Sequence, residues 1–558
     1  MKVKRIGILL ESTESNKHLY ETVRALAESG EAELFLLKYR KEEPKGLSGH
    51  LRSRLRFRRL WRAIELAFFH FIIGMEFKLL SVAYPKIREH YETRRLDSLS
   101  RNEVVELAPT FSNSGLVVQL AEADIQTLKA LNLDLIVRDN ALGCSQGGII
   151  TAAKDGMLSL HHGDNRRNRG GPAAFWEVYQ REPSTGFVIQ ILTGELGGGV
   201  VLFRGNVPTR RSYTQNLVNL FEASFPYLTS ILLEYAHSGR LPKCEIPVPY
   251  GGRVLLDPNL AQSVSYAART TWLFVKFLTK RWILKQYKRW NVAFEPKNWD
   301  SAILCRGMTI QNPPGHFFAD PFLASRDGRT VCFVEDYSFS TKRARISAVE
   351  ILDDRTYEFL GPVLEEPFHM SFPFLFEHEG SLFMIPETSE ASAIRLYRCV
   401  EFPLKWEYQK ELMANKRAAD TMLFELEGRW WMLTNVASPG SLDFCSQLCA
   451  FYATDPFSCE WSPHQQNPIV FDSAIARNAG LLRLADGTLV RCRQRQGFDQ
   501  YGEGFSLARI TELTPASFRE EEIAKITPEF FPKLQGCHHL SSNGEYTVFD
   551  FARTDNLK

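Results

Sequence analysis

Hydrophobic and polar positions follow one pattern before residue 290 and another after it. In the first part, the apolar runs "RIGILL", "LDLIVRD" and "FVIQIL" alternate with helical stretches such as "KHLYETVRALAES". Strands that are apolar on both faces and separated by helices are typical of an α/β domain with a mainly parallel sheet. We therefore predict an α/β domain over residues 1–245.

Beyond residue 290 the helical pattern gives way to short aromatic-rich strands, such as "RTVCFVEDYS", "GSLFMIPETS" and "GRWWMLTNV". Each follows a polar turn that contains glycine, and the turn glycines recur about every 50 residues, the length of a four-stranded propeller blade. These glycines are residues 328, 380, 428, 487 and 544. The spacing predicts an all-β five-bladed β-propeller over residues 293–558, with residues 246–292 as a linker and a basic amphipathic helix.

The strand upstream of each turn carries a polar residue beside an apolar stretch. If these strands are the innermost of their blades, their polar side chains converge near the central channel. The residues are Asp320, Ser371, Asp420, Arg477 and His538. We expect Asp320, Asp420, Arg477 and His538 to form a substrate-binding pocket there.

The second part also resembles a known domain. The segments "HFFADPF", "HMSFPFLFEHEGSLFMIPET", "ADTMLFELEGRWWML" and "GCHHL" resemble the N-terminal propeller of plant glucosamine inositolphosphorylceramide transferases, itself similar to five-bladed glycosidase propellers. The resemblance implies that Asp320 matches a first-blade glycosidase aspartate, with Asp336, Glu387, Asp420 and Asp550 as further candidate carboxylates. Carbohydrate binding is the favoured role, and hydrolysis is the alternative.

Residues 130–205 are similar to the formyltransferase fold of methionyl-tRNA and sugar N-formyltransferases. The similarity rests on "GMLSLHHGDNRRNRGGPAAFW", residues 156–176, and on the turn "GELGGG" that follows the next strand. It implies 10-formyltetrahydrofolate as cofactor and an amine as acceptor. In that chemistry a histidine moves a proton, an amide stabilises the oxyanion, and an aspartate orients the histidine.

The formyltransferase pattern is only partly kept. The family's histidine maps onto His161, but Ser159 replaces the asparagine and Gly197 replaces the aspartate. We therefore expect His161 as the central catalytic group and Ser159 as the oxyanion donor. The acidic partner of His161 would then be Asp164 or Glu195.

The same loop is rich in groups that could bind an anion. Arg166, Arg167 and Arg169, with His162 beside them, are expected to contact a nucleotide-sugar diphosphate or the folate glutamate. In the alternative, one arginine only braces the turn before Gly170.

Together these features predict an enzyme that transfers a formyl group to an amino sugar or glycan precursor, with a carbohydrate-binding propeller. Two alternatives stay open. One is a noncatalytic glycan-binding scaffold with a degenerate formyltransferase domain, and the other is a propeller glycoside hydrolase.

Charge and composition add limits. Lys and Arg total 67 against 65 Asp and Glu, so no nucleic-acid partner is expected. The ten cysteines include no CxxC pair, so no metal site is predicted. The first residues lack a signal-peptide pattern, and the expected location is cytoplasmic.

Two segments combine basic and aromatic residues. Six arginines in "LRSRLRFRRLWR" (51–62) precede the apolar run "LAFFHFIIGM" (66–75), and "TTWLFVKFLTKRWILKQYKRW" (270–290) is similar in kind. Neither has the ~20 uninterrupted apolar residues of a spanning helix. Such helices can lie on an anionic membrane surface, although packing between domains or subunits is the favoured interpretation.

Overall fold

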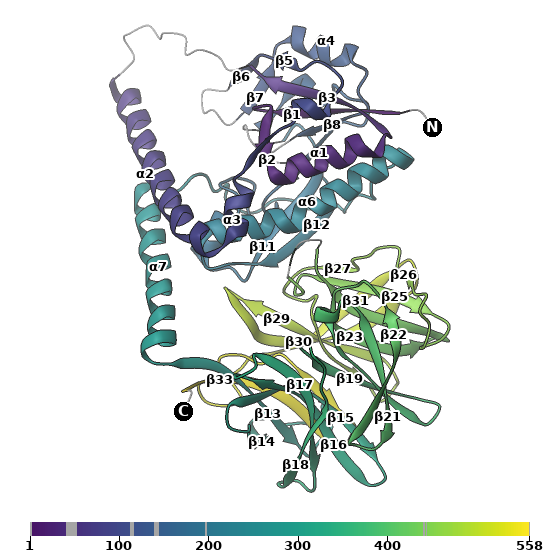
Figure 1. Ribbon diagram of the computed structural model, residues 1–558. Coiled ribbons are helices and arrows are strands. Elements are labelled where there is room, and N and C mark those ends of the chain that lie inside the picture. Colours follow the sequence, from purple (N-terminus) through teal and green to yellow (C-terminus); the bar gives the residue numbers. More distant parts are fainter. Residues whose placement is uncertain are drawn as a thin grey trace. The chain divides into compact units, whose positions relative to one another are not determined.

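The computed structural model describes residues 3–40, 53–111, 117–138, 144–195, 198–438, 441 and 443–556. The chain forms two compact units, Met1–Leu273 and Phe274–Lys558 (Figure 1). The expected boundaries at residues 245 and 293 stay a prediction.

The first unit is built on a seven-stranded mixed sheet. In spatial order its strands are β12 (Gly199–Pro208), β11 (Ser184–Leu192), β10 (Met157–His161), β8 (Leu135–Arg138), β1 (Lys4–Leu10), β3 (Ala32–Tyr39) and β5 (Val105–Leu107). The five strands from β10 to β5 run parallel to their neighbours, whereas β11 and β12 are antiparallel. The predicted mainly parallel sheet with helices is present, whereas the finer expectation of a formyltransferase fold is not shown.

Helices and small sheets complete this unit. The helices are α1 (Lys17–Ser29), α2 (Ser53–Ala83), α3 (Pro85–His90), α4 (Glu122–Ala130), α5 (Phe175–Gln180), α6 (Tyr213–Ser238) and α7 (Leu260–Leu278). The small sheets are β2 (Glu14–Asn16) with β4 (Thr93–Arg95), and β6 (Pro109–Phe111) with β7 (Val117–Leu120) and β9 (Cys144–Ser145).

Helix α1 shows how local sequence sets a boundary. The Asn16 side chain accepts a hydrogen bond from the Leu19 amide at the N-terminus, and Gly30 ends the helix with φ of 70°. Such caps satisfy backbone groups that the helix itself leaves unpaired.

The second unit consists of five β-sheets, one for each predicted blade (Figure 1). The first two blades are β15 (His316–Arg326), β16 (Arg329–Ser338), β17 (Arg343–Ile351) and β18 (Tyr357–Leu364), then β19 (Ser371–His378), β20 (Ser381–Glu387), β21 (Ile394–Glu401) and β22 (Lys405–Met413). The third is β23 (Ala418–Leu426), β24 (Arg429–Val436), β25 (Gln447–Ala453) and β26 (Ser462–Pro463), with β27 (Val470–Phe471) also on β25. The fourth is β28 (Asn478–Arg483), β29 (Leu489–Gly497), β30 (Gln500–Leu513) and β31 (Phe518–Ile526).

The fifth blade closes the ring with strands from both ends of the unit. It contains β32 (Leu540–Ser542) and β33 (Thr547–Asn556) beside β13 (Gln286–Glu295) and β14 (Met308–Ile310). Strand β13 pairs with β33 along its whole length, from Gln286 opposite Asn556 to Glu295 opposite Thr547. The five-bladed propeller is therefore confirmed, with its first and last strands hydrogen-bonded together.

The turn glycines lie where their spacing predicted, between the first and second strands of the five blades. All five have positive φ, from 72° at Gly380 to 95° at Gly544. In three blades the preceding residue, Asp327, Glu379 or Glu427, also has positive φ. This is the twist that two-residue hairpin turns require.

One expected helix is shorter than its sequence pattern. Of residues 270–290, α7 ends at Leu278, a π-helical turn covers Thr279–Ile283, and β13 begins at Gln286. The last five residues form a strand because they pair with β33, so tertiary pairing overrides the local helical periodicity there.

Candidate functional site

The inner strands of the propeller share one backbone irregularity. Each inner strand contacts the next around the ring, from β15 through β19, β23 and β28 to β32 and back to β15. In the first four blades the pairing of the inner strand shifts by one residue at the same place, so that two inner-strand residues lie opposite one: Ala319/Phe322, Ser371/Phe374, Ala419/Met422 and Asn478/Leu481. A bulge re-aims the side chains that it contains.

Two of these bulges hold a carboxylate in a strained conformation. Asp320 has φ of 47° and Asp420 has φ of 48°, and Phe372 takes the equivalent place in the second blade. A side chain held at positive φ costs on the order of 1 kcal/mol and is concentrated at functional sites. Blades one and three therefore present Asp320 and Asp420 from matching positions.

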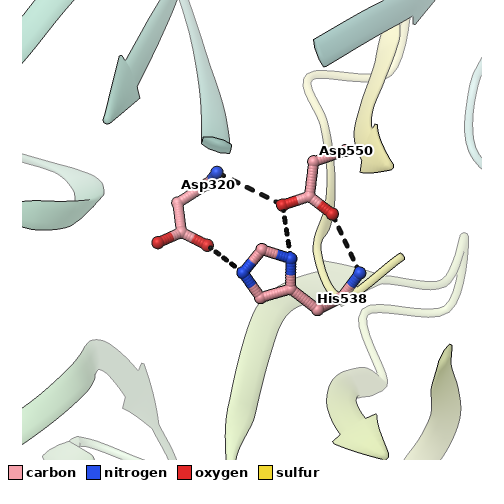
Figure 2. A group of neighbouring side chains, drawn as sticks. All are labelled: Asp320, His538 and Asp550. Atoms are coloured by element: carbon pink, nitrogen blue, oxygen red, sulfur yellow. Dashed lines mark hydrogen bonds and ion pairs between the residues drawn. The ribbon is translucent and has the colours of Figure 1, made fainter. Parts of the chain in front are cut away.

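Asp320 belongs to a buried chain of charges with His538 and Asp550 (Figure 2). The His538 ring lies between the carboxylates, with Nε2 3.3 Å from Asp320 Oδ1 and Nδ1 2.7 Å from Asp550 Oδ2. Asp550 also accepts hydrogen bonds from the amides of His538 (2.8 Å), His539 (3.0 Å) and Asp320 (3.3 Å). The carboxylate of Asp550 thus fixes the position of the imidazole and of the Asp320 backbone.

The carboxyls of this chain titrate in opposite directions. Burial, reinforced by Asp550 and Glu387 and opposed by His538 and Arg477, raises the pKa of Asp320 to about 6. Burial also opposes ionisation of Asp550, but His538, His539 and the amide donors outweigh it and lower the pKa of Asp550. One carboxylate is held charged while the other can exchange a proton near neutral pH.

A second chain of charges crosses the centre from Asp420. Arg477 Nε donates to Asp420 Oδ2 at 2.6 Å and Nη2 donates to Oδ1 at 3.2 Å. Arg477 also lies 3.6 Å from Glu387, which accepts from Ser371 Oγ at 3.2 Å. Arg477 is thus shared by carboxylates of the second and third blades.

Glu335 adds a buried acid to the same region. It is paired with Ala319 in the strand register, directly beside the bulge that holds Asp320. Burial, together with repulsion from Asp320 and Glu387, raises the pKa of Glu335 well above its ordinary value. Its carboxyl therefore favours the protonated form, which can donate a hydrogen bond or a proton, more strongly than an ordinary glutamate does.

Aromatic rings border these charges. The Trp290 ring lies 4.0 Å from the His538 ring, centre to centre, and the Tyr501 ring lies 5.3 Å from it. The Arg477 guanidinium stacks over Tyr501 at 5.2 Å. Tyr501 is 39% exposed, so part of its surface can meet a ligand.

The structure brings together all five polar residues expected near the channel. Asp320 pairs with His538 and Asp420 with Arg477, while Ser371 is linked to Arg477 through Glu387. Asp336 lies apart from them, because its neighbour Glu335 points inward and strand side chains alternate. Its carboxylate is bound by His316, Arg345 and Ser347.

Sequence reasoning missed Glu335, Trp290, Tyr501 and His539. Glu335 lies opposite "FADPF" in the strand register, so a prediction of the bulge in that segment would have pointed to it. Trp290 lies in a segment expected to be helical, and Tyr501 has no sequence signal that sets it apart from other tyrosines.

A metal ion is one possible occupant of the first chain. Asp320, His538 and Asp550 each offer a ligand atom, and these atoms lie within 4.8 Å of one another. Carboxylate oxygens and an imidazole suit several divalent cations. The imidazole already faces both carboxylates, so the function proposed below uses the side chains alone.

The loop of the first unit holds the residues expected for formyl transfer. His161 ends β10, its Nε2 lies 3.4 Å from the Asn168 carbonyl, and burial lowers its pKa. Ser159 is buried two residues earlier on the same strand. Asp164 is ion-paired with Arg204, and the Glu195 side chain is 80% exposed and 4.0 Å from Arg169.

His162 and the loop arginines also have partners within this unit. His162 stacks on Phe221 with a centroid distance of 3.9 Å and contacts Ser224. Arg166 pairs with Glu245 at 3.2 Å and Arg167 with Glu182 at 2.7 Å, while Arg169 stacks on Tyr250 at 4.7 Å. A cavity of about 280 Å³ lies beside Arg166, Arg169, Arg204, Glu245 and Tyr250. Gly197 lies outside the described residues.

Comparison with known proteins relates the propeller to one family. Residues 284–531 match the family described as the N-terminal domain of glucosamine inositolphosphorylceramide transferase 1. A curated protein of that name from Oryza sativa subsp. japonica is 34% identical over 234 residues, which is 41% of this chain and 30% of the relative. The protein of the same name from Arabidopsis thaliana is 34% identical over 224 residues, or 40% and 29%. The chain thus spans less than a third of these relatives, and the predicted resemblance of the propeller is confirmed.

Solved structures of low similarity include two glycoside hydrolases. A family 117 glycoside hydrolase of Zobellia galactanivorans has 9% identity and a TM-score of 0.32, over 49% of this chain and 91% of its own. The GH62 α-L-arabinofuranosidase catalytic domain of Coprinopsis cinerea has 10% identity and a TM-score of 0.33, over 48% and 97%.

These findings correct the expected activity. Transfer of a formyl group from 10-formyltetrahydrofolate is wrong as the function, because the relatives carry the name of a glucosamine inositolphosphorylceramide transferase. The contacts of the loop agree with this correction. Asp164 is ion-paired with Arg204 and Glu195 points to solvent, so these contacts hold neither acid against His161.

Proposed function

We propose that the propeller binds a carbohydrate at its centre and takes part in a glycosyl-transferring process. The observation that carries this proposal is the pair of buried charge chains, Asp320–His538–Asp550 and Asp420–Arg477–Glu387, beside aromatic rings. Sugar hydroxyls both donate and accept hydrogen bonds, so fixed carboxylates and a guanidinium can each bind them. The exposed face of Tyr501 can pack on the C–H face of a sugar ring.

The similarity of the propeller to named sugar-transferring proteins supports the ligand class. The match covers the segment that supplies Asp320, Glu387, Asp420 and Arg477, four residues of the two charge chains. Charged side chains that are already held in place before the ligand binds also lower the free-energy cost of ordering side chains on binding.

A second candidate role is proton transfer during the glycosyl transfer itself. It is favoured by the opposite pKa shifts of Asp320 and Asp550 and by the raised pKa of the buried Glu335. In this role Asp320 takes the proton of an acceptor hydroxyl while the oxygen of that hydroxyl bonds to the anomeric carbon. The bond from that carbon to the leaving group breaks, and Glu335 can donate the proton that the leaving oxygen needs.

Calorimetric titration of the full chain with a panel of neutral, amino and acidic sugars tests the binding proposal. We expect one sugar class to bind, and Asp320→Asn and Asp420→Asn each to weaken its affinity at least about tenfold. Asparagine is nearly isosteric with aspartate and tolerates positive φ, so these variants should fold. The matched control is Asp327→Asn, an exposed turn residue of the first blade that also has positive φ.

Equal sugar affinity in the parent chain, both site variants and the control would overturn the proposal for the centre of the propeller. If binding survives while glycosyl transfer is lost in Asp320→Asn, the proton-transfer role is supported.

A further inference from the structure

Helix α2 packs on the unit to which it belongs with one face and exposes a second, apolar face. The inward face carries Glu65, Phe69, Glu76 and Leu80, four residues that recur at helical spacing. Phe69 packs edge-to-face on Phe175 at 5.1 Å. This face fastens the helix to the first unit.

The outward face is a stripe of large apolar side chains exposed to solvent. Its members recur every three, four or seven positions, which places them on one side of the helix. They are Leu60, Ile64, Phe71, Met75, Leu79 and Val82, with exposed fractions of 63% at Phe71, 69% at Leu79 and 87% at Val82. A contiguous exposed stripe of this kind marks an interaction surface.

The charges near the stripe are mostly basic. From residue 53 to residue 88 the sequence has eight Lys and Arg, against the two carboxylates Glu65 and Glu76. Both carboxylates are held on the inward face: Glu65 accepts from the Leu260 amide at 3.3 Å, and Glu76 accepts from the Thr214 amide at 2.7 Å. The segment therefore has an excess of basic residues in its sequence, and neither carboxylate of the helix lies on the outward face.

We propose that the outward face of α2 docks on an anionic lipid bilayer, with the helix lying in the interfacial plane. Exposed Phe, Leu, Met and Val supply the apolar surface, and the excess of Lys and Arg in the sequence of this segment supplies attraction to anionic headgroups. A protein partner would gain nothing from so uniform a positive charge unless it were strongly acidic.

The structure distinguishes lying on the membrane from crossing it. By length and composition Leu60–Ala83 is long and apolar enough to span a bilayer, although Arg62, Glu65, Glu76 and Lys78 interrupt its apolar residues. A spanning orientation, however, would strip the inward contacts from Glu65 to Leu80 and leave two carboxylates in hydrocarbon. An interfacial orientation keeps every one of those contacts.

Co-sedimentation of the full chain with phosphatidylcholine vesicles, with and without phosphatidylserine, tests the proposal. We expect binding to vesicles that contain phosphatidylserine and its decline as sodium chloride is raised. The double variant Phe71→Glu/Leu79→Glu should lower the partition coefficient at least about tenfold, because two charges would enter the interface. The matched control is Leu352→Glu/Leu404→Glu, two similarly exposed leucines in turns of the propeller.

Absence of vesicle binding by the parent chain, or equal binding by the helix variant and the control, would overturn the proposal. So would binding that salt does not reduce and that only detergent reverses, because that result indicates a helix across the bilayer. If light scattering shows a parent dimer that the helix variant dissociates, and vesicles are not bound, the stripe pairs two copies of the chain instead.

Discussion

At the scale of single residues, the proposed site depends on carboxylates whose surroundings differ although their chemistry is the same. Asp550 receives amide hydrogen bonds and an imidazole, whereas Asp320 is buried near other carboxylates. The sequence could identify Asp320, Asp420, Arg477 and His538 as polar residues of inner strands. It could not identify which carboxyl is protonated, because that depends on distances between blades.

The raised pKa of Asp320 predicts a pH-dependent effect on stability. Its pKa is 3.8 in the unfolded chain and about 6 in the fold, so the fold favours the protonated form. Ionisation therefore costs stability as the pH rises from about 4 to above 6, by roughly 3 kcal/mol at most.

We expect Asp320→Asn, which cannot ionise, to raise the thermal midpoint relative to the parent chain more at pH 8 than at pH 4. Differential scanning calorimetry at the two pH values measures this. A difference that shrinks as the pH rises would contradict the assigned shift, and Asp327→Asn should show no such trend.

At the scale of elements, the turns were more predictable than the strands that they connect. Each turn has a glycine at positive φ, a conformation that glycine adopts without steric cost, so Gly328, Gly380, Gly428, Gly487 and Gly544 mark the blades directly in the sequence. The bulges at Asp320 and Asp420 have no such signal, because aspartate occurs in many other conformations. The end of α7 was missed for a related reason: β13 is defined by its pairing with distant β33.

The turn at Gly428 offers a test of this reasoning. Its φ is 73°, and a Cβ placed there would meet no atom within 4 Å, so Gly428→Ala changes the backbone energy alone. We expect a loss of about 1 kcal/mol in the free energy of unfolding, measured by denaturant titration.

Gly251 serves as the control for that substitution. A Cβ there also meets open space, and its backbone is not left-handed. Gly251→Ala should therefore leave stability unchanged or slightly raise it. Equal effects of the two substitutions would contradict the turn assignment.

At the scale of the whole molecule, composition and periodicity predicted an α/β unit followed by a propeller, and both are present. Function was harder to predict. A formyltransferase activity was predicted from the loop around His161, but Asp164 of that loop is ion-paired with Arg204 and Glu195 points to solvent. A sequence pattern along one loop does not fix the side-chain contacts of a catalytic site, because several separate strands must supply those contacts together.

The most direct measurement is a crystal structure of the full chain soaked with the sugar that binds best in the calorimetric panel. We expect sugar density at the centre of the propeller, with hydroxyls within hydrogen-bond distance of Asp320, Asp420 or Arg477. Density in the cavity beside Arg166 and Arg204 of the first unit, with the propeller centre empty, would contradict it.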